Sequence, residues 1–125
     1  MTENEISYLV RGAIFKVYRA LGPGLLESVY ELALGHELTR SGFDIKCQLL
    51  LPVWYEGMKL DGGFRVDILV NDSVIIEIKS VEHLAEVHHK QILTYMRLAN
   101  KKLGILVNFN SQDIGSSIYR KVNKL

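Results

Sequence analysis

The chain has 125 residues, of which 48% are hydrophobic and 23% are charged. These values are typical of a globular protein with a sizeable core, and we expect one domain over residues 1–125. No apolar run approaches the roughly 20 residues of a membrane helix. Cys47 is the one cysteine, which excludes an internal disulfide and a cysteine-ligated metal cluster. We therefore expect a cytoplasmic protein that makes no use of a membrane.

The net charge of +1 conceals an uneven distribution. Residues 1–100 carry a formal balance of −3, whereas residues 101–125 carry +4. A basic C-terminal segment could contact phosphate groups, but a solvated polar face explains it equally well. The overall balance excludes a strongly basic nucleic-acid binder.

Two helices are predicted first. Thr2 and Glu5 form a capping box ahead of apolar residues with helical spacing. Gly22-Pro23-Gly24 ends this first helix, because proline cannot continue it. A second helix is expected from about Leu25 to Arg40, with Gly42 as its C-terminal cap.

The middle of the chain is rich in β-branched and alternating residues. A strand begins at Ile45, and Pro52 is expected to break it before Val53–Tyr55 resumes. A separate short strand is expected at Met58–Leu60, followed by apolar strands at 64–70 and 74–79.

Helical spacing then returns near 83–100, where Leu84, Val87, Gln91, Thr94, Tyr95 and Leu98 share one face. Residues 103–109 form a buried strand, and residues 118–122 form an edge strand or a helical turn. The order predicts an α/β or α+β fold with helices packed on a sheet.

Charged residues interrupt the two apolar strands. Side chains alternate across a strand, so Val66, Ile68 and Val70 should share a face with Val74, Ile76 and Ile78. A three-residue connection over 71–73 gives the required parity. Asp67 would then lie opposite Glu77, on the same side as Lys79. Burying such groups is costly unless they pair or bind metal, so they predict a site for a hard divalent cation and a phosphate.

The spacing Asp67…Glu77-Ile78-Lys79 resembles the motif of the PD-(D/E)xK phosphodiesterase superfamily, with Val66 in place of the usual proline. Two further segments support the resemblance. Residues 24–30 resemble the signature of the GxxExxY proteins, and residues 91–95 resemble the Q-x-x-x-Y motif of exonuclease-type members. The resemblance extends over essentially the whole chain. It implies a restriction-endonuclease-like core, with an antiparallel Asp67/Glu77 hairpin in a mixed sheet flanked by helices.

The resemblance also implies roles for individual residues. Asp67 and Glu77 would be inner ligands of Mg²⁺ or Mn²⁺, together with the Ile78 backbone carbonyl and Glu27. Lys79 would orient the attacking water or stabilise the charge that develops on the phosphoryl group. The catalytic set would be completed from the helices by Glu27, Gln91 and Tyr95.

Structural explanations compete with some of these roles. Glu27 could be a favourable charge in the first turn of a helix. Gln91 and Tyr95 could be packing residues at the edge of the core, and Tyr30 is better explained by packing than by catalysis. The histidines at 36, 83, 88 and 89 lack the spacing of a zinc site, and we expect them to be structural or on the surface.

The function predicted from the sequence is a Mg²⁺- or Mn²⁺-dependent nuclease that acts on nucleic acid, with DNA favoured. The alternative is a nuclease-fold binding or scaffold protein with a weak or inactive site. A homodimer is compatible with either function, since Trp54, Tyr55 and Met58 could form an interface or part of the core.

Overall fold

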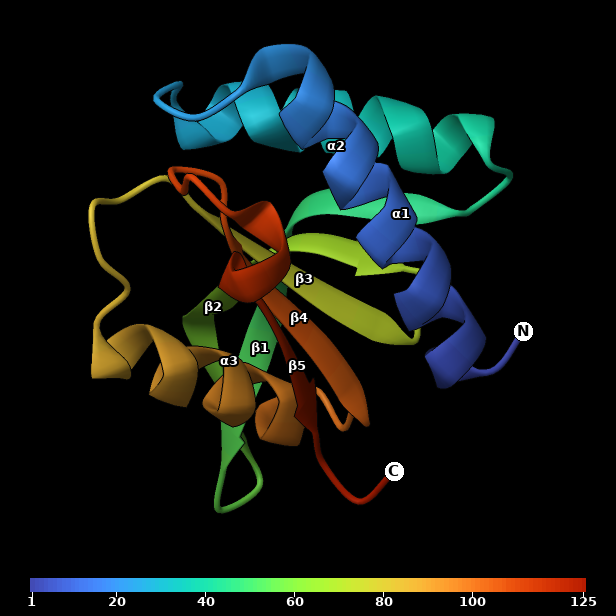
Figure 1. The fold of residues 1–125 in the computed structure, drawn as a ribbon. Helices are drawn as coiled ribbons and strands as arrows, with labels where there is room; N and C mark the ends of the chain where they lie inside the picture. The colour runs from blue at the N-terminus through green and yellow to red at the C-terminus, as the bar shows by residue number, and fades with distance from the viewer.

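A computed structural model describes all 125 residues and shows a mixed α+β fold, as predicted. Three helices pack on a five-stranded mixed sheet (Figure 1). The elements are α1 (Glu3–Leu21), α2 (Glu27–Arg40), β1 (Ile45–Tyr55), β2 (Met58–Val70), β3 (Val74–Lys79), α3 (Glu86–Leu98), β4 (Leu103–Asn108), η1 (Ile114–Ser117) and β5 (Ile118–Val122). No helix has the length and apolar character needed to cross a membrane.

The first two helices begin and end close to where their sequence signals place them. Thr2 and Glu5 form the predicted capping box at the start of α1. Gly22 ends α1 with a φ of 70°, a backbone conformation that glycine adopts without strain. The second helix begins two residues later than expected, at Glu27.

The sheet has the order β1-β2-β3-β4-β5. Neighbouring strands are antiparallel except β3 and β4, which are parallel and joined by α3. A parallel pair needs such a crossover because its second strand must start at the same edge as the first. Residues 118–122 form an edge strand, one of the two predicted alternatives.

Each face of the sheet has its own apolar core. Helices α1 and α2 cover one face, where Ile68, Val70, Ile76 and Ile78 lie in a cluster of 18 buried residues. Helix α3 covers the other face, where seven further residues are buried: Phe64, Val66, Leu69, Ile75, Ile92, Met96 and Leu106. Figure 1 shows the sheet between these two helical layers.

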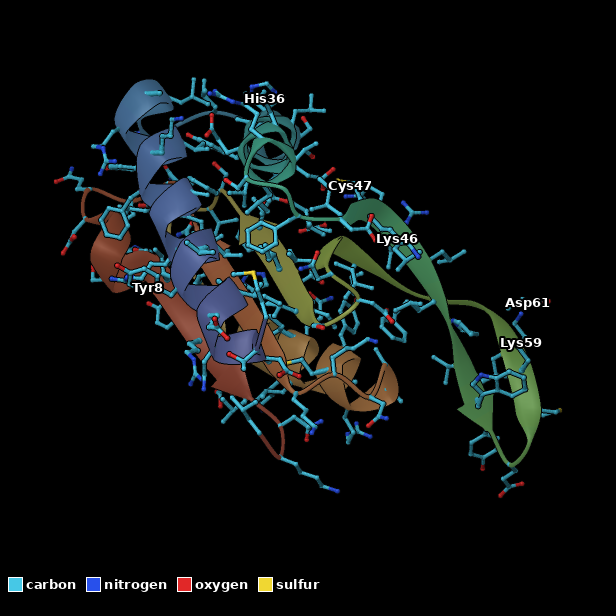
Figure 2. All side chains as sticks on the ribbon, turned by 90° about the vertical axis from the view of Figure 1, so that its right-hand side faces the viewer. Tyr8, His36, Lys46, Cys47, Lys59 and Asp61 are labelled. Atoms are coloured by element: carbon cyan, nitrogen blue, oxygen red, sulfur yellow. The ribbon has the colours of Figure 1, made fainter.

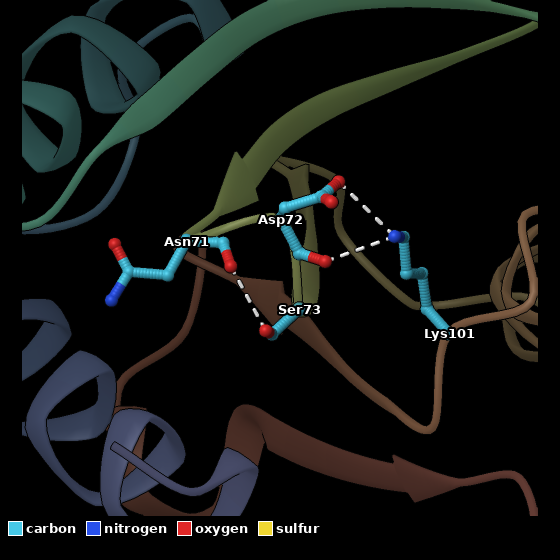
Figure 3. Close-up of polar contacts among 4 residues, drawn as sticks. All are labelled: Asn71, Asp72, Ser73 and Lys101. Atoms are coloured by element: carbon cyan, nitrogen blue, oxygen red, sulfur yellow. Dashed lines mark hydrogen bonds and ion pairs between the residues drawn. The ribbon is translucent and has the colours of Figure 1, made fainter.

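The predicted connection between β2 and β3 is confirmed. Ile68 pairs with Ile76 and Val70 pairs with Val74, which leaves three residues in the turn. Asn71 and Asp72 have positive φ angles of 50° and 53°, which these short polar side chains tolerate. The Ser73 hydroxyl donates to the Asn71 carbonyl, and Lys101 binds Asp72 at 3.1 Å (Figure 3).

The prediction that Val66 lies on the same face as Ile68 is wrong. Val66 packs in the cluster beneath α3, whereas Ile68 packs beneath α1 and α2. The β1–β2 pairing passes from Leu49–Val66 to Cys47–Ile68 without the pair Gln48–Asp67. Gln48 has a φ of 51°, outside the extended region. This local break in the strands changes which side chains of β2 face each core.

The predicted breaks in β1 and β2 are also wrong. The strand β1 continues through Pro52, and β2 continues from Met58 to Val70. Pro52 lies in a bulge between Leu51 and Val53. A strand tolerates proline at a bulge or at a sheet edge. The two strands therefore form one long hairpin that projects beyond the sheet (Figure 1).

The predicted buried face of the third helix needs correction as well. Val87 and Leu98 are exposed, whereas Ile92 and Met96 are fully buried. These two side chains pack over Gly104 of β4, where an added Cβ would lie 2.6 Å from the Met96 sulfur. The absence of a side chain at this glycine allows α3 to approach the sheet and selects the face that is buried.

Candidate active site

Asp67 and Glu77 meet where β2 and β3 separate. The ladder between these strands ends at Ile68–Ile76. Beyond it, the Asp67 backbone N–H donates to Glu77 Oε2 at 3.2 Å, and the Ile78 N–H donates to Asp67 Oδ2 at 2.8 Å. The two carboxylates therefore bond the backbone at the end of the ladder. The structure brings them together as their register predicts.

Glu77 is only 4% exposed. Burial, reinforced by the negative charge of Asp67, raises the pKa of Glu77 from 4.5 to about 9, although Lys79 opposes the shift. Burial disfavours the charged form of a carboxyl group, and so does a like charge nearby. Glu77 therefore holds a proton at neutral pH in the absence of a bound cation.

Lys79 is the last residue of β3 and is partly buried. It lies two residues after Glu77, so both side chains leave the strand on the same side. Its backbone carbonyl accepts a hydrogen bond from the Phe109 N–H at 2.9 Å. None of the ion pairs within the chain involves the Lys79 ammonium.

Glu27 reaches the site from the first turn of α2. Its Oε2 accepts a hydrogen bond from the Ser80 N–H at 3.1 Å, immediately after β3. The Ser80 hydroxyl in turn donates to the Leu25 carbonyl. These bonds hold the start of α2 against the end of β3. A cavity of about 370 Å³ lies between them and is lined by Glu27, Ser28, Glu31, Gln48, Asp67 and Ile78.

Two residues of this cavity were missed by the sequence analysis. The Gln48 amide donates to Asp67 Oδ1 at 3.2 Å and also to a carboxylate oxygen of Glu31. Burial and the charge of Asp67 raise the pKa of Glu31, while the Gln48 hydrogen bond opposes the rise. Glu31 lies one turn after Glu27, so helical spacing could have revealed it. The place of Gln48 depends on the break in β1 and has no such signal.

Gln91 and Tyr95 lie one turn apart on α3, on the other face of the sheet. Tyr95 stacks on Phe64 with ring centroids 4.7 Å apart. Burial and the charge of Glu77 raise the pKa of the Tyr95 hydroxyl, and a hydrogen bond with Gln91 opposes this rise. Tyr95 therefore packs against the core and lies within the electrostatic influence of Glu77, whereas Gln91 is connected to it only through Tyr95.

Tyr30 packs in the core and does not line the site. Its ring is fully buried and stacks on Phe109, with centroids 4.3 Å apart. Its hydroxyl donates to the Gly22 carbonyl and accepts from the Leu25 N–H at 3.1 Å. These bonds hold the loop between α1 and α2, and with it the start of the helix that carries Glu27.

The chemistry of the donors fits a hard cation. Asp67, Glu77 and Glu27 offer only carboxylate oxygens, which suit Mg²⁺ or Mn²⁺. No group of three or more His, Cys, Asp or Glu side chains is arranged closely enough to hold an ion by itself. Mg²⁺ is commonly held by one or two carboxylates together with water and phosphate oxygens, and Asp67 with Glu77 meets that smaller requirement.

The mixed α+β fold, with two acids where β2 and β3 separate, has the architecture of a restriction-endonuclease-like domain, and comparison with protein families identifies the class by sequence. The model of the PD-(D/E)XK nuclease superfamily matches residues 4–121. The chain belongs to this superfamily. No curated protein and no solved structure gives a match.

Proposed function

We propose that this protein is a nuclease that uses Mg²⁺ or Mn²⁺ to hydrolyse phosphodiester bonds, with DNA as the favoured substrate, and that it is a GxxExxY-type member of its superfamily. The observation that carries the proposal is the contact between Asp67 and Glu77 at the end of the β2–β3 ladder. Lys79 follows Glu77 by two residues, on the same side of β3. Superfamily membership supports a nucleic-acid substrate.

Asp67 and Glu77 would hold the cation together with the Ile78 carbonyl, and Glu27 would have to leave the Ser80 N–H to become a further ligand. A divalent ion bound there supplies positive charge to the phosphoryl oxygens and lowers the pKa of a bound water. Glu77 must release its proton when the site is loaded, because a metal ligand binds as the carboxylate. The hydrogen bond from Ile78 to Asp67 fixes the orientation of that carboxylate before the cation arrives.

Lys79 would provide the second positive charge. Its ammonium can orient the attacking water or bind the phosphoryl oxygens as their negative charge increases. Gln91 and Tyr95 would limit the movement of Glu77 and Lys79 from the side of α3. Both are polar groups that can donate hydrogen bonds to a phosphate or to a bound water.

Cleavage of labelled single- and double-stranded DNA and RNA with Mg²⁺ or Mn²⁺ tests this proposal. We expect Lys79→Ala to reduce the cleavage rate by roughly 10²-fold or more, as for other groups that stabilise transition-state charge. Lys90→Ala is the matched control, since Lys90 lies exposed on α3 beside Glu86. Equal rates for the wild type and for Lys79→Ala and Asp67→Ala on every substrate would contradict nuclease activity.

No three acidic, histidine or cysteine side chains are arranged closely enough to hold an ion by themselves, which favours a second candidate, a nuclease-fold binding or scaffold protein with an inactive site. Mn²⁺ titration separates the two. A nuclease site should bind Mn²⁺, and Asp67→Asn should abolish binding, whereas Asp44→Asn, an exposed acid at the start of β1, should not. Tight nucleic-acid binding without Mn²⁺ binding would support the second candidate.

A further inference from the structure

The hairpin of β1 and β2 projects beyond the sheet and has no neighbour there. Pairing between β2 and β3 begins only at Ile68, so earlier residues of β2 pair with β1 alone. We call residues 50–65, from the Leu50–Arg65 pair to the turn, the β-arm. Figure 2 shows it extending away from the helices, with Lys59 and Asp61 on it. A two-stranded ribbon gains little from burial and must be supported otherwise.

The base of the β-arm is fixed to the body of the protein. Phe64 stacks on Tyr95 of α3, and Gly63 lies against the Leu51 carbonyl so closely that an added Cβ would be 1.9 Å from its oxygen. The β-arm is therefore held in a defined direction relative to α3.

Large apolar side chains are exposed along this ribbon. Trp54 is 62% exposed, and Leu50, Tyr55, Met58 and Leu60 are exposed as well. The interpretation of Trp54, Tyr55 and Met58 as part of the core is thereby excluded. Contiguous apolar side chains on a surface mark an interaction site.

Cations accompany these side chains. Lys59 is the cross-strand partner of Trp54. Lys46 lines a groove of about 310 Å³ together with Trp54 and the end of α3. Neither of these two cations has an ion-pair partner within the chain. Arg65 lies between Phe64 and Val66, which face α3, so its side chain leaves β2 on the opposite face. The surface that surrounds Trp54 therefore suits an aromatic ligand that carries negative charge.

We infer that the β-arm binds single-stranded nucleic acid, with a base stacked on Trp54 and the backbone phosphates on Lys46 and Lys59. Stacking on aromatic rings beside a cationic track is the usual way in which unpaired strands are held. Stacking on Trp54 requires an unstacked base, which a single strand offers and an intact double helix does not. This requirement favours a single strand over a double helix.

The position of the β-arm relates this surface to the proposed site. Lys59 precedes Asp67 on β2 by a span of about 26 Å, at ~3.3 Å per residue of strand. A stacked strand advances about 3.4 Å per nucleotide, so roughly eight nucleotides would connect the two. This inference rests on the proposed function for its substrate class, and it predicts that oligonucleotides much shorter than this cannot reach both surfaces.

Trp54 is the one tryptophan of the chain, so its fluorescence reports on this surface alone. We expect a 20-nucleotide single-stranded DNA, added in EDTA to prevent cleavage, to quench the emission of the wild-type protein. In anisotropy measurements with labelled DNA, Trp54→Ala should weaken binding roughly five- to hundredfold. Trp54→Phe, which keeps a ring, should retain most of the affinity.

Tyr8→Ala is the control, because Tyr8 is an exposed aromatic on α1, away from the β-arm (Figure 2). It should bind as the wild type does. Unchanged Trp54 emission at saturating DNA would overturn the inference, as would preference for duplex DNA. A shift in emission with protein concentration alone, together with a dimer in light scattering, would assign the surface to a second copy and also overturn it.

The measurement in EDTA is independent of catalysis. Binding that depends on Trp54 in a protein without cleavage activity would support the inference and contradict the nuclease proposal. Cleavage of single-stranded DNA that Trp54→Ala leaves unchanged, together with unchanged DNA binding, would do the reverse.

Discussion

Glu77 is the one acidic or basic residue of this chain that is buried. Its carboxylate accepts a hydrogen bond from the Asp67 backbone N–H. An unfolded chain would lose the Glu77 proton near pH 4.5, whereas the folded chain keeps it to about pH 9. The folded state therefore binds more protons between these values, and stability falls as pH rises through this window. Below pH 4.5 the contribution is fully present.

Replacement of this acid by a neutral isostere should remove the pH dependence. We expect Glu77→Gln to have a free energy of unfolding roughly 1–3 kcal/mol higher than the wild type near pH 8, with little difference near pH 4. Urea denaturation at a series of pH values measures both. Glu56→Gln, in the exposed turn of the β-arm, should follow the wild type. Parallel stability curves for Glu77→Gln and wild type would show that Glu77 ionises normally.

Tyr30 illustrates how a residue of a sequence signature can act through structure. Its hydroxyl satisfies two backbone groups of the α1–α2 loop, one at Gly22 and one at Leu25. We expect Tyr30→Phe to lose about 1 kcal/mol of stability, because the loop would lose two hydrogen bonds at partly buried groups. Urea denaturation midpoints measure the loss. Tyr8→Phe, at an exposed position, should be neutral, and equal midpoints for the two variants would contradict the role of the hydroxyl.

At the scale of elements, two glycines in different environments allow a matched comparison. A Cβ on Gly63 would overlap the Leu51 carbonyl at 1.9 Å, whereas one on Gly12 of α1 would meet nothing within 4 Å. Gly63→Ala should destabilise the protein by roughly 1–3 kcal/mol or more. Gly12→Ala should stabilise it by about 0.5–1 kcal/mol, since alanine is the better helix former. Thermal unfolding of both variants measures this, and a stable Gly63→Ala would show that the β-arm tolerates a shift at its base.

Local signals predicted the elements best. The capping box of α1 and the three-residue turn at 71–73 depend on neighbouring residues, and the structure confirms both. Strict alternation predicts the wrong face for Val66 because a break at Gln48 and Asp67 interrupts it. No local pattern marks that break, since Gln48 is neither glycine nor asparagine and its positive φ is held by tertiary contacts.

The site was predicted in the same uneven way. Strand register brought Asp67 and Glu77 together, because it follows from the hydrophobic pattern. Gln48 bonds both Asp67 and Glu31, and this arrangement comes from the packing of α2 over β1. A sequence pattern within one element cannot specify which residue of another element it meets. The extension of the β-arm was missed for a related reason, since Pro52 is accommodated by a bulge.

On the scale of the whole molecule, charge is divided between two regions. The cavity beside Asp67 is lined by the acids Glu27 and Glu31, which repel a polyanion until cations are bound. The β-arm is balanced in charge, with Lys59 and Arg65 against Glu56 and Asp61, and the adjacent Lys46 adds a cation without an ion-pair partner. Of the basic C-terminal residues, Lys101 is paired with Asp72 and Lys121 lies 2.8 Å from His89. Both are engaged within the fold.

This distribution predicts a shallow dependence of DNA binding on salt. If Lys46 and Lys59 are the phosphate contacts, two counterions are displaced, and the logarithm of the binding constant for a single strand should fall with the logarithm of salt concentration with a slope of about −1.4. Anisotropy titrations in EDTA over a range of NaCl concentrations measure the slope. Lys59→Ala should reduce it by about 0.7, whereas Lys124→Ala should leave it unchanged. A slope of about −4 or steeper, reduced by Lys124→Ala, would instead place the strand along the basic C-terminal segment, where its phosphates would compete with Asp72 for Lys101.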